Sequence, residues 1–211
     1  MDLVLVVGNT ALVCTIASHF SGLPICWDFF KKRSTSNVSV LPFLAAFICS
    51  SLWLFYSIFT RDSTLQVVNS VAAFLQLSYV FCFYVNTSFK KTTFQKVFTT
   101  FACLIISYLY SFHVVEAEKG KALMGYLASM GSILASAAPL ASVSDVIKSQ
   151  SSESLPFPII FSTFIVQALW CIYGILVHDM FIQVPNLIGA LISFILLSLF
   201  FIYPASSKKD L

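Results

Sequence analysis

The chain has 211 residues, of which 58% are hydrophobic and only 10% are charged, and its mean hydropathy is +0.90. A soluble domain of this length can bury a sizeable core and still carry ordinary surface charge, so the apolar excess must face lipid. The composition therefore excludes a soluble globular protein and predicts an integral membrane protein.

Seven apolar runs follow one another along the chain, and each has the length of about 20 residues that a membrane-spanning helix needs. Only short stretches around Arg61-Asp62 and His178-Asp179 separate the second span from the third and the sixth from the seventh. These tight hairpins leave no room for an extramembrane domain. The predicted spans are 3–26, 41–59, 65–85, 94–114, 122–145, 157–177 and 181–203.

Basic residues are distributed unevenly between the two ends of these spans, nine on one side and three on the other. Cytosolic loops are enriched in lysine and arginine, so this count predicts a cytosolic C-terminus and an N-terminus outside. The acidic start at Met1-Asp2 also favours a retained first helix over a cleaved signal peptide. The basic residues are, on the first side, Lys31, Lys32, Arg33, Lys90, Lys91, Lys96, Lys148, Lys208 and Lys209, and on the second Arg61, Lys119 and Lys121.

Several function classes are disfavoured by what the sequence lacks. The net charge of +3 follows from basic residues that flank spans, which argues against a nucleic-acid partner. No phosphate-binding loop, dinucleotide motif, nucleophile elbow or metal-spaced histidine cluster occurs, so we expect no enzyme, no cofactor and no metal site. The six cysteines lie in or at the ends of apolar spans with no CxxC, as small packing residues do.

The chain contains an internal duplication. Residues 47–83 align with 164–200 without a gap, and twelve of the 37 positions are identical. Chance would give roughly three or four identities in a composition this apolar. Spans one to three therefore match spans five to seven, and the even displacement of four spans makes the two units parallel. The repeated pattern W-x2-Y-x5-D-x6-N is formed by Trp53, Tyr56, Asp62 and Asn69 and again by Trp170, Tyr173, Asp179 and Asn186.

The duplication predicts an all-α membrane protein with seven transmembrane helices, in which two parallel three-helix bundles (3+1+3) are joined by an inversion-linker helix. Such a scaffold is typical of transporters with a substrate site near the bilayer midplane, between the repeats. A seven-helix receptor is the rival class, but it would not need the duplication. The expected boundaries are 1–89 for the first bundle, 90–118 for the linker helix, 119–205 for the second bundle and 206–211 for a short cytosolic tail.

Asn69 and Asn186 lie little more than one turn inside the third and seventh spans. An amide in hydrocarbon needs a partner or a wet cavity, so each asparagine either holds helices together or lines a pocket. Its occurrence at both symmetric positions favours a pocket, and amide donors and acceptors suit a neutral polyol. Trp53 and Trp170 could stack on sugar rings, although an interfacial aromatic belt is the alternative. No charged residue lies in the middle of the matched spans, which argues against an ionic substrate.

Two sets of residues are candidate gates. Tyr56 with Asp62 and Tyr173 with Asp179 lie toward the outer end, where the tyrosine of one unit can face the aspartate of the other. Solvated hairpin ends are the alternative interpretation. At the inner end each unit carries two prolines, which permit kinks and thus a hinge, although a proline at a helix start is also routine. These prolines are Pro24 and Pro42 in the first unit and Pro139 and Pro156 in the second.

Four stretches of the chain carry a combined pattern that can be compared with known families. They are SGLPICWDFFKKRSTSNVSVLPF at 21–43, SSLWLFYS at 50–57, APLASVSDVIKSQSSESLPFP at 138–158 and WCIYGILVHDMFIQVPNLIG at 170–189. Together they resemble the SWEET (MtN3/saliva) family of sugar transporters. The resemblance extends from Gly8 to Pro204 and implies facilitated, bidirectional movement of mono- or disaccharides by rocking of two triple-helix bundles.

The resemblance also implies roles for individual residues. Asn69, Asn186 and Trp170 match the family's pocket, with Trp53 at the symmetric site, and Cys49 and Val166 are similar to positions that tune sugar size. The family's proline tetrad falls on the four prolines named above, and its outer gate on Tyr56, Tyr173 and Asp179. One departure is Ser57, which replaces a glycine that Gly174 keeps in the second unit, so the outer mouth is expected to be asymmetric.

A facilitative sugar uniporter is therefore the predicted function. A seven-helix receptor or cargo receptor, or a carrier of another small neutral solute, is the alternative. The expected partners are a sugar and membrane lipid, and a homo-oligomer is compatible with the pattern. The final residues Lys-Lys-Asp-Leu fit a dilysine retrieval signal for a Golgi or ER membrane, while basic flanking of the last span in the plasma membrane explains the same lysines.

Overall fold

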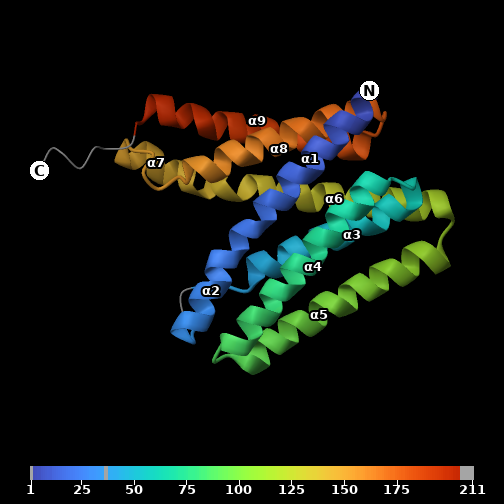
Figure 1. The fold of residues 1–211 in the computed structure, drawn as a ribbon, viewed down its shortest axis with the longest axis horizontal. Coiled ribbons are helices and arrows are strands. Elements are labelled where there is room, and N and C mark those ends of the chain that lie inside the picture. The colour runs from blue at the N-terminus through green and yellow to red at the C-terminus, as the bar shows by residue number, and fades with distance from the viewer. Residues whose placement is uncertain (1, 36–37, 205–211) are drawn as a thin grey trace, which may run out of the picture. The chain divides into compact units, whose positions relative to one another are not determined.

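The structure is a computed structural model that describes residues 2–35 and 38–204 (Figure 1). Within these ranges the chain is helical and forms no strand. Seven helical segments are long and apolar enough to cross a membrane, which confirms the predicted number of spans. They are Leu3–Lys32, Leu41–Thr60, Ser63–Asn86, Lys90–Val114, Ala117–Ser149, Phe157–Leu176 and Met180–Ile202.

The first and fifth spans are each interrupted by a short 3₁₀ turn, and a proline lies within the turn or two residues after it. In the first span α1 (Leu3–His19) passes through η1 (Phe20–Gly22) into α2 (Leu23–Lys32), with Pro24 in the first turn of α2. Proline donates no backbone hydrogen bond, so the regular α-helical pattern cannot continue through it. The fifth span repeats the arrangement with α6 (Ala117–Ala137), η3 (Ala138–Ser142) and α7 (Val143–Ser149), and Pro139 lies within η3.

The remaining spans run without a 3₁₀ break. Helices α3 (Leu41–Thr60) and α4 (Ser63–Asn86) form one hairpin, and α8 (Phe157–Leu176) and α9 (Met180–Ile202) form the other. Figure 1 shows the two helices of each hairpin side by side. The unmatched span is α5 (Lys90–Leu109), which ends in the π-helical turn η2 (Tyr110–Val114).

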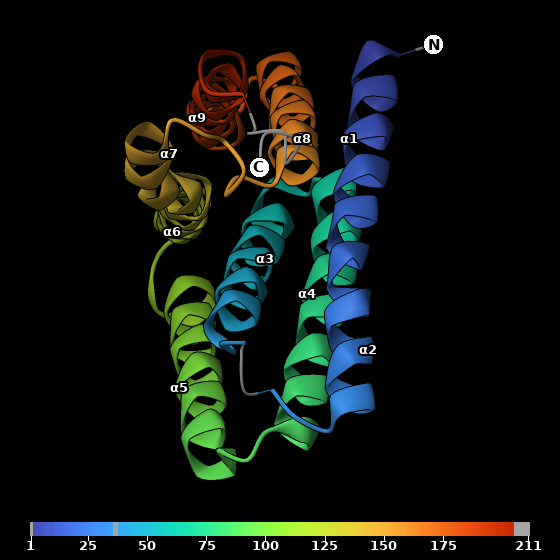
Figure 2. The same cartoon turned by 90° about the vertical axis from the view of Figure 1, so that its left-hand side faces the viewer.

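The chain divides into two compact units, one formed by residues 12–128 and the other by residues 1–11 and 129–211. In the 12–128 unit, α2 packs along α4 (Figure 2). The rings of Phe29 and Phe83 meet there edge to face, with their centroids 5.7 Å apart. This core joins the short helix after the kink to the start of α3 and the end of α4. Its buried members are Cys26, Phe29, Val40, Phe43, Leu44, Tyr79, Val80, Cys82 and Phe83.

The second unit has a core at the corresponding place. There α7, the short helix after the second kink, packs with the start of α8 and the end of α9. Val146 is fully buried at its centre. The duplication thus preserves which elements form the core, although few of the core residues are identical. The buried members are Val146, Leu155, Ile160, Leu196 and Leu199.

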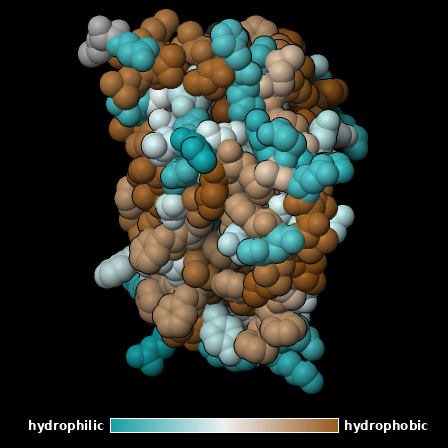
Figure 3. All heavy atoms as spheres, turned by 90° about the vertical axis from the view of Figure 1, so that its right-hand side faces the viewer, coloured by the Kyte–Doolittle hydropathy of each residue, from teal (hydrophilic) through white to brown (hydrophobic). Residues whose placement is uncertain are grey.

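The outward surfaces of these helices are strongly apolar, and many hydrophobic side chains are visible in Figure 3. Phe74 and Phe81 on α4 are 70% and 66% exposed, and Phe201 on α9 is 87% exposed. In water such surfaces would drive aggregation, whereas in a bilayer they contact lipid. The predicted tail at 206–211, with the dilysine signal Lys208-Lys209, lies outside the described residues.

Candidate substrate site and gates

The two matched tryptophans have the same local geometry in both repeats. Trp53 on α3 and Trp170 on α8 are buried, with 7% and 6% of their surface exposed. Each indole meets the tyrosine one turn later edge to face: the centroids of Trp53 and Tyr56 are 5.7 Å apart, and those of Trp170 and Tyr173 are 5.4 Å apart. Edge-to-face contact is a preferred aromatic arrangement. Burial of both indoles argues against the interfacial belt, whose rings lie among lipid headgroups.

The two matched asparagines are half-buried, and their side chains bond in the same way. Asn69 Nδ2 donates to the carbonyl oxygen of Leu65 at 2.9 Å, and Asn186 Nδ2 donates to that of Ile182 at 2.7 Å. Both bonds lie within the asparagine's own helix, and across the described residues neither side chain bonds to another helix. This geometry argues against the interhelical role. Each amide keeps its second hydrogen and its oxygen for a further partner.

The second repeat has a feature beside Asn186 that sequence comparison of the repeats missed. Pro185 is buried inside α9 and cannot donate to the Phe181 carbonyl four residues earlier. Ser129 on α6 supplies a donor instead, with its Oγ 3.0 Å from that carbonyl oxygen. At the matched position of the first repeat Val68 retains its amide. A proline inside an apolar span was the available signal, but the repeat comparison counted only identities.

Cys49 and Val166, one turn before their tryptophans, are half-buried, and their role in limiting sugar size stays a prediction. Next to Val166, Gln167 was also missed by the sequence analysis. Gln167 Nε2 donates to Ser136 Oγ at 2.7 Å, which ties α8 to α6. Its amide group also lies against Gly189 of α9, where an added Cβ would collide with it. Gln167 on α8 therefore contacts both α6 and α9.

Asp62 and Asp179 cap the helices that follow them. Asp62 Oδ1 accepts from the Leu65 amide at 3.0 Å, and Asp179 Oδ1 accepts from the Phe181 amide at 2.9 Å. The residue before each aspartate, Arg61 or His178, adopts a left-handed conformation that ends the preceding helix. Capping explains why both hairpins keep aspartate. The pairing of each aspartate with the tyrosine of the other unit stays a prediction.

The asymmetry expected at Ser57 and Gly174 has a local cause. Ser57 Oγ donates to the carbonyl oxygen of Leu54 at 2.6 Å, so its side chain folds back onto α3. At Gly174 an added Cβ would lie 2.6 Å from the Gln183 amide nitrogen, because α8 and α9 approach more closely there. The second hairpin therefore requires glycine where the first does not.

The four prolines lie at breaks or starts of helices. Pro42 is in the first turn of α3, and Pro156 directly precedes α8, positions that proline commonly occupies. At the Pro24 kink the Leu23 amide donates to Phe20, three residues back. The Tyr79 hydroxyl donates to the neighbouring His19 carbonyl oxygen at 2.9 Å and so stabilises this junction.

The model of the family described as sugar efflux transporters for intercellular exchange matches residues 5–91 and 122–208. The chain belongs to this family. The two matches correspond to the two repeats and leave residues 92–121, most of the predicted linker, between them. The family transports sugars and is not a family of enzymes, and the chain is an all-α, multi-pass integral membrane protein.

Two relatives named as sugar transporters are similar to this chain over about nine tenths of their length. The sugar transporter SWEET1 of Drosophila pseudoobscura pseudoobscura is 35% identical over 201 residues, which cover 94% of this chain and 89% of the relative. SWEET1 of Mus musculus is 31% identical and covers 95% of this chain and 91% of its own. A solved structure of a eukaryotic SWEET transporter has the same fold, with a TM-score of 0.87, 24% identity and coverage of 95% and 96%. The predicted resemblance to the SWEET family is thereby confirmed.

Proposed function

We propose that the chain is a facilitative, bidirectional sugar uniporter that works by alternating access. The observation that carries the proposal is the repeated site geometry: a buried tryptophan against a tyrosine, followed by a half-buried asparagine that bonds only within its own helix. Membership of a sugar-transporting family and relatives named as sugar transporters support the substrate class. The proposed substrates are monosaccharides and, in addition, disaccharides.

Asn69 and Asn186 are proposed to bind the sugar hydroxyls through the amide atoms that their helices do not use. Trp53 and Trp170 would cover the apolar faces of the ring. Cys49 and Val166, one turn earlier, would limit the size of the sugar. The site needs no ion, because hydroxyl groups are satisfied by neutral donors and acceptors.

Gating is proposed to use the two ends of the repeats. At the outer end, Tyr56 would donate to Asp179 and Tyr173 to Asp62, so that each aspartate serves both as a cap and as a gate. At the inner end, the kinks at Pro24 and Pro139 and the helix starts at Pro42 and Pro156 would let the bundles bend. Because the concentration gradient of the sugar sets the direction of a uniporter, the gates need no coupled ion or nucleotide.

The proposed moving units are the bundles 1–89 and 119–205, with 90–118 as the linker. The distribution of lysine and arginine supports an N-terminus outside and a cytosolic C-terminus, in the plasma membrane or a Golgi or ER membrane. A pH-sensitive fluorescent protein fused to the C-terminus tests the orientation. Its fluorescence should resist acidification of the medium around intact cells and respond once the cells are permeabilised.

Transport itself is tested with the purified chain in proteoliposomes. Labelled glucose or sucrose should enter down its gradient at the same rate with and without a pH gradient, and unlabelled sugar inside should accelerate the exchange of label. Asn69→Ala and Asn186→Ala should each abolish uptake while the thermal unfolding temperature changes little, since each side chain bonds only to its own helix. A receptor would bind sugar in this assay but fail to move it, and uptake that survives both substitutions would refute the proposed site.

A further inference from the structure

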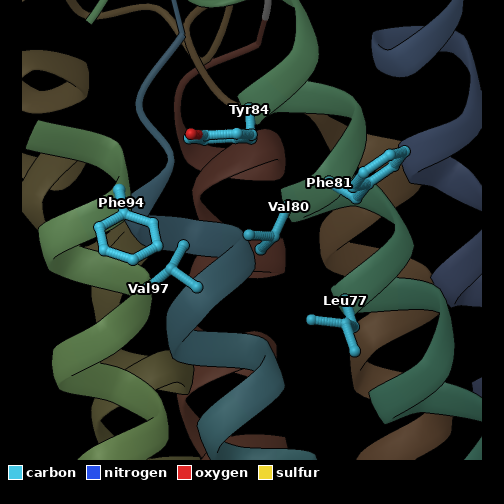
Figure 4. Close-up of a pocket in the computed structure, with 6 residues that line it drawn as sticks. All are labelled: Leu77, Val80, Phe81, Tyr84, Phe94 and Val97. Carbon is cyan, nitrogen blue, oxygen red and sulfur yellow. The ribbon is translucent and has the colours of Figure 1, made fainter. Parts of the chain in front are cut away.

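A narrow groove runs between α4 and α5 in the 12–128 unit. Leu77, Val80, Phe81 and Tyr84 line it from α4, and Phe94 and Val97 line it from α5 (Figure 4). Its volume is about 150 Å³. None of the residues proposed to bind or gate the sugar lines this groove, so it requires a separate explanation.

The size and lining of the groove point to a hydrocarbon chain. Pockets for compact small molecules usually measure about 300–1,000 Å³ and contain several polar groups. This groove is smaller, and its lining is aliphatic and aromatic apart from the Tyr84 hydroxyl. Both walls belong to helices that are long and apolar enough to span the membrane, so lipid is the surrounding medium. A stretch of one acyl chain that lies along this groove fits its lining better than a soluble solute does.

A positive charge lies where the groove ends at Tyr84. The Lys90 ammonium lies over the Tyr84 ring, 5.0 Å from its centroid, and donates to the carbonyl oxygens of Tyr84 and Val85. An ammonium group has three hydrogens, so one remains for an anion. Lys91 and Lys96 lie exposed on the first two turns of α5.

No acidic residue offsets these three lysines on either helix. Between Asp62 and Glu116 the sequence contains neither aspartate nor glutamate. The groove therefore combines an apolar slot with an uncompensated basic end, which complements a lipid that has an acyl chain below an anionic phosphate. In the orientation proposed above, these lysines lie on the cytosolic side, where anionic lipids are concentrated.

We propose that the groove between α4 and α5 binds one acyl chain of an anionic phospholipid, with its phosphate among Lys90, Lys91 and Lys96. The proposal does not depend on which solute the chain transports. Binding at this site would hold α5 against α4 and orient the start of α5 at the membrane surface.

Native mass spectrometry of the full-length chain, purified in detergent, tests the proposal. The probes are phosphatidylglycerol and phosphatidylcholine with identical acyl chains, and soluble glycerol phosphate. The variant that tests headgroup binding is Lys90→Gln/Lys91→Gln/Lys96→Gln. Its control is Lys31→Gln/Lys121→Gln/Lys148→Gln, which removes three positive charges at positions away from the groove. The groove variant is Val97→Phe, and its control is Ile105→Phe, an exposed position on α5 that does not line the groove. Leu77→Phe fills the other end of the groove if Val97→Phe fails to fold.

Phosphatidylglycerol should bind tightly and phosphatidylcholine weakly, and glycerol phosphate should not be retained. The triple lysine variant should weaken phosphatidylglycerol binding roughly a hundredfold, about fivefold for each lysine removed, while the control triple variant changes it little. Val97→Phe or Leu77→Phe should weaken binding of both phospholipids, and Ile105→Phe should not. The proposed anionic site would be overturned if both phospholipids bound equally well. It would also be overturned if the triple lysine variant bound phosphatidylglycerol as tightly as the unmodified chain does. Retention of glycerol phosphate as tightly as phosphatidylglycerol, or binding unaffected by filling the groove, would overturn the role of the acyl chain.

Discussion

Ser129 Oγ on α6 donates a hydrogen bond to the Phe181 carbonyl oxygen on α9, 3.0 Å away. That carbonyl lies four residues before Pro185, the residue that cannot donate to it in the usual helical pattern. Pro185 in turn directly precedes Asn186 of the proposed sugar site. One serine on a neighbouring helix thus stabilises the backbone that positions a candidate binding residue.

Removal of the Ser129 hydroxyl should cost stability and displace Asn186. Ser129→Ala is expected to lower the free energy of unfolding by about 1 kcal/mol, the usual contribution of such a bond. It should also raise KM for sugar more than it lowers the maximal rate, while Ser129→Thr retains both. Thermal unfolding in detergent and proteoliposome uptake measure the two effects.

A double-mutant cycle identifies the cause. Pro185→Val restores the amide that the first repeat has at Val68, so the cost of Ser129→Ala should shrink in that background. If Ser129→Ala lowers the free energy of unfolding equally in both backgrounds, then Ser129 contributes through packing. It would not contribute through its hydrogen bond to the Phe181 carbonyl.

Gln167 and Gly189 form a pair whose sizes complement each other. An added Cβ on Gly189 would collide with the Gln167 amide group, and the matched residues of the first repeat are Ser50 and Ala72. Gly189→Ala alone should therefore destabilise the protein by about 1–3 kcal/mol, as overpacking does. Gln167→Ser/Gly189→Ala, which transplants the pair from the first repeat, should recover most of that loss in thermal unfolding. A double variant no more stable than Gly189→Ala would show that the loss has another origin than this contact.

The Tyr79 hydroxyl connects α4 to the Pro24 kink through the His19 carbonyl. Tyr79→Phe removes only this hydrogen bond and keeps the ring that packs against Gly22. We expect a loss of about 1 kcal/mol in the free energy of unfolding. Tyr84→Phe is the matched control, because the structure gives the Tyr84 side chain a ring contact with Lys90 instead of a helix-to-helix hydrogen bond. Comparable losses in both variants would contradict the role assigned to Tyr79.

The number of spans could be predicted from the sequence because length and apolarity alone decide it. The duplicated spacing identified the matched tryptophans and tyrosines, but their edge-to-face contacts were not predicted. The 3₁₀ turns around Pro24 and Pro139 were anticipated as kinks, since the cause is the missing amide of a single residue. Contacts such as Ser129 with Phe181 could not be predicted, because they depend on how helices distant in the sequence are rotated against one another. Gln167 was overlooked for a related reason: its first-repeat counterpart Ser50 is a different residue, and its contacts with Ser136 and Gly189 appear only once the helices are packed.

The capping and gating roles of Asp62 and Asp179 can be separated by comparing amide and alanine substitutions. Asparagine also caps helices, so Asp62→Asn and Asp179→Asn should preserve stability, whereas each alanine variant should lose about 1 kcal/mol. At an outer gate the aspartates would also accept hydrogen bonds from tyrosines. The asparagine variants keep an acceptor oxygen there but lose the negative charge, so the hydrogen bonds that close the outer gate become weaker. Their uptake should then change while their unfolding temperatures stay near that of the unmodified chain. Unchanged uptake in the stable asparagine variants, together with impaired uptake only in the destabilised alanine variants, would reduce both aspartates to helix caps.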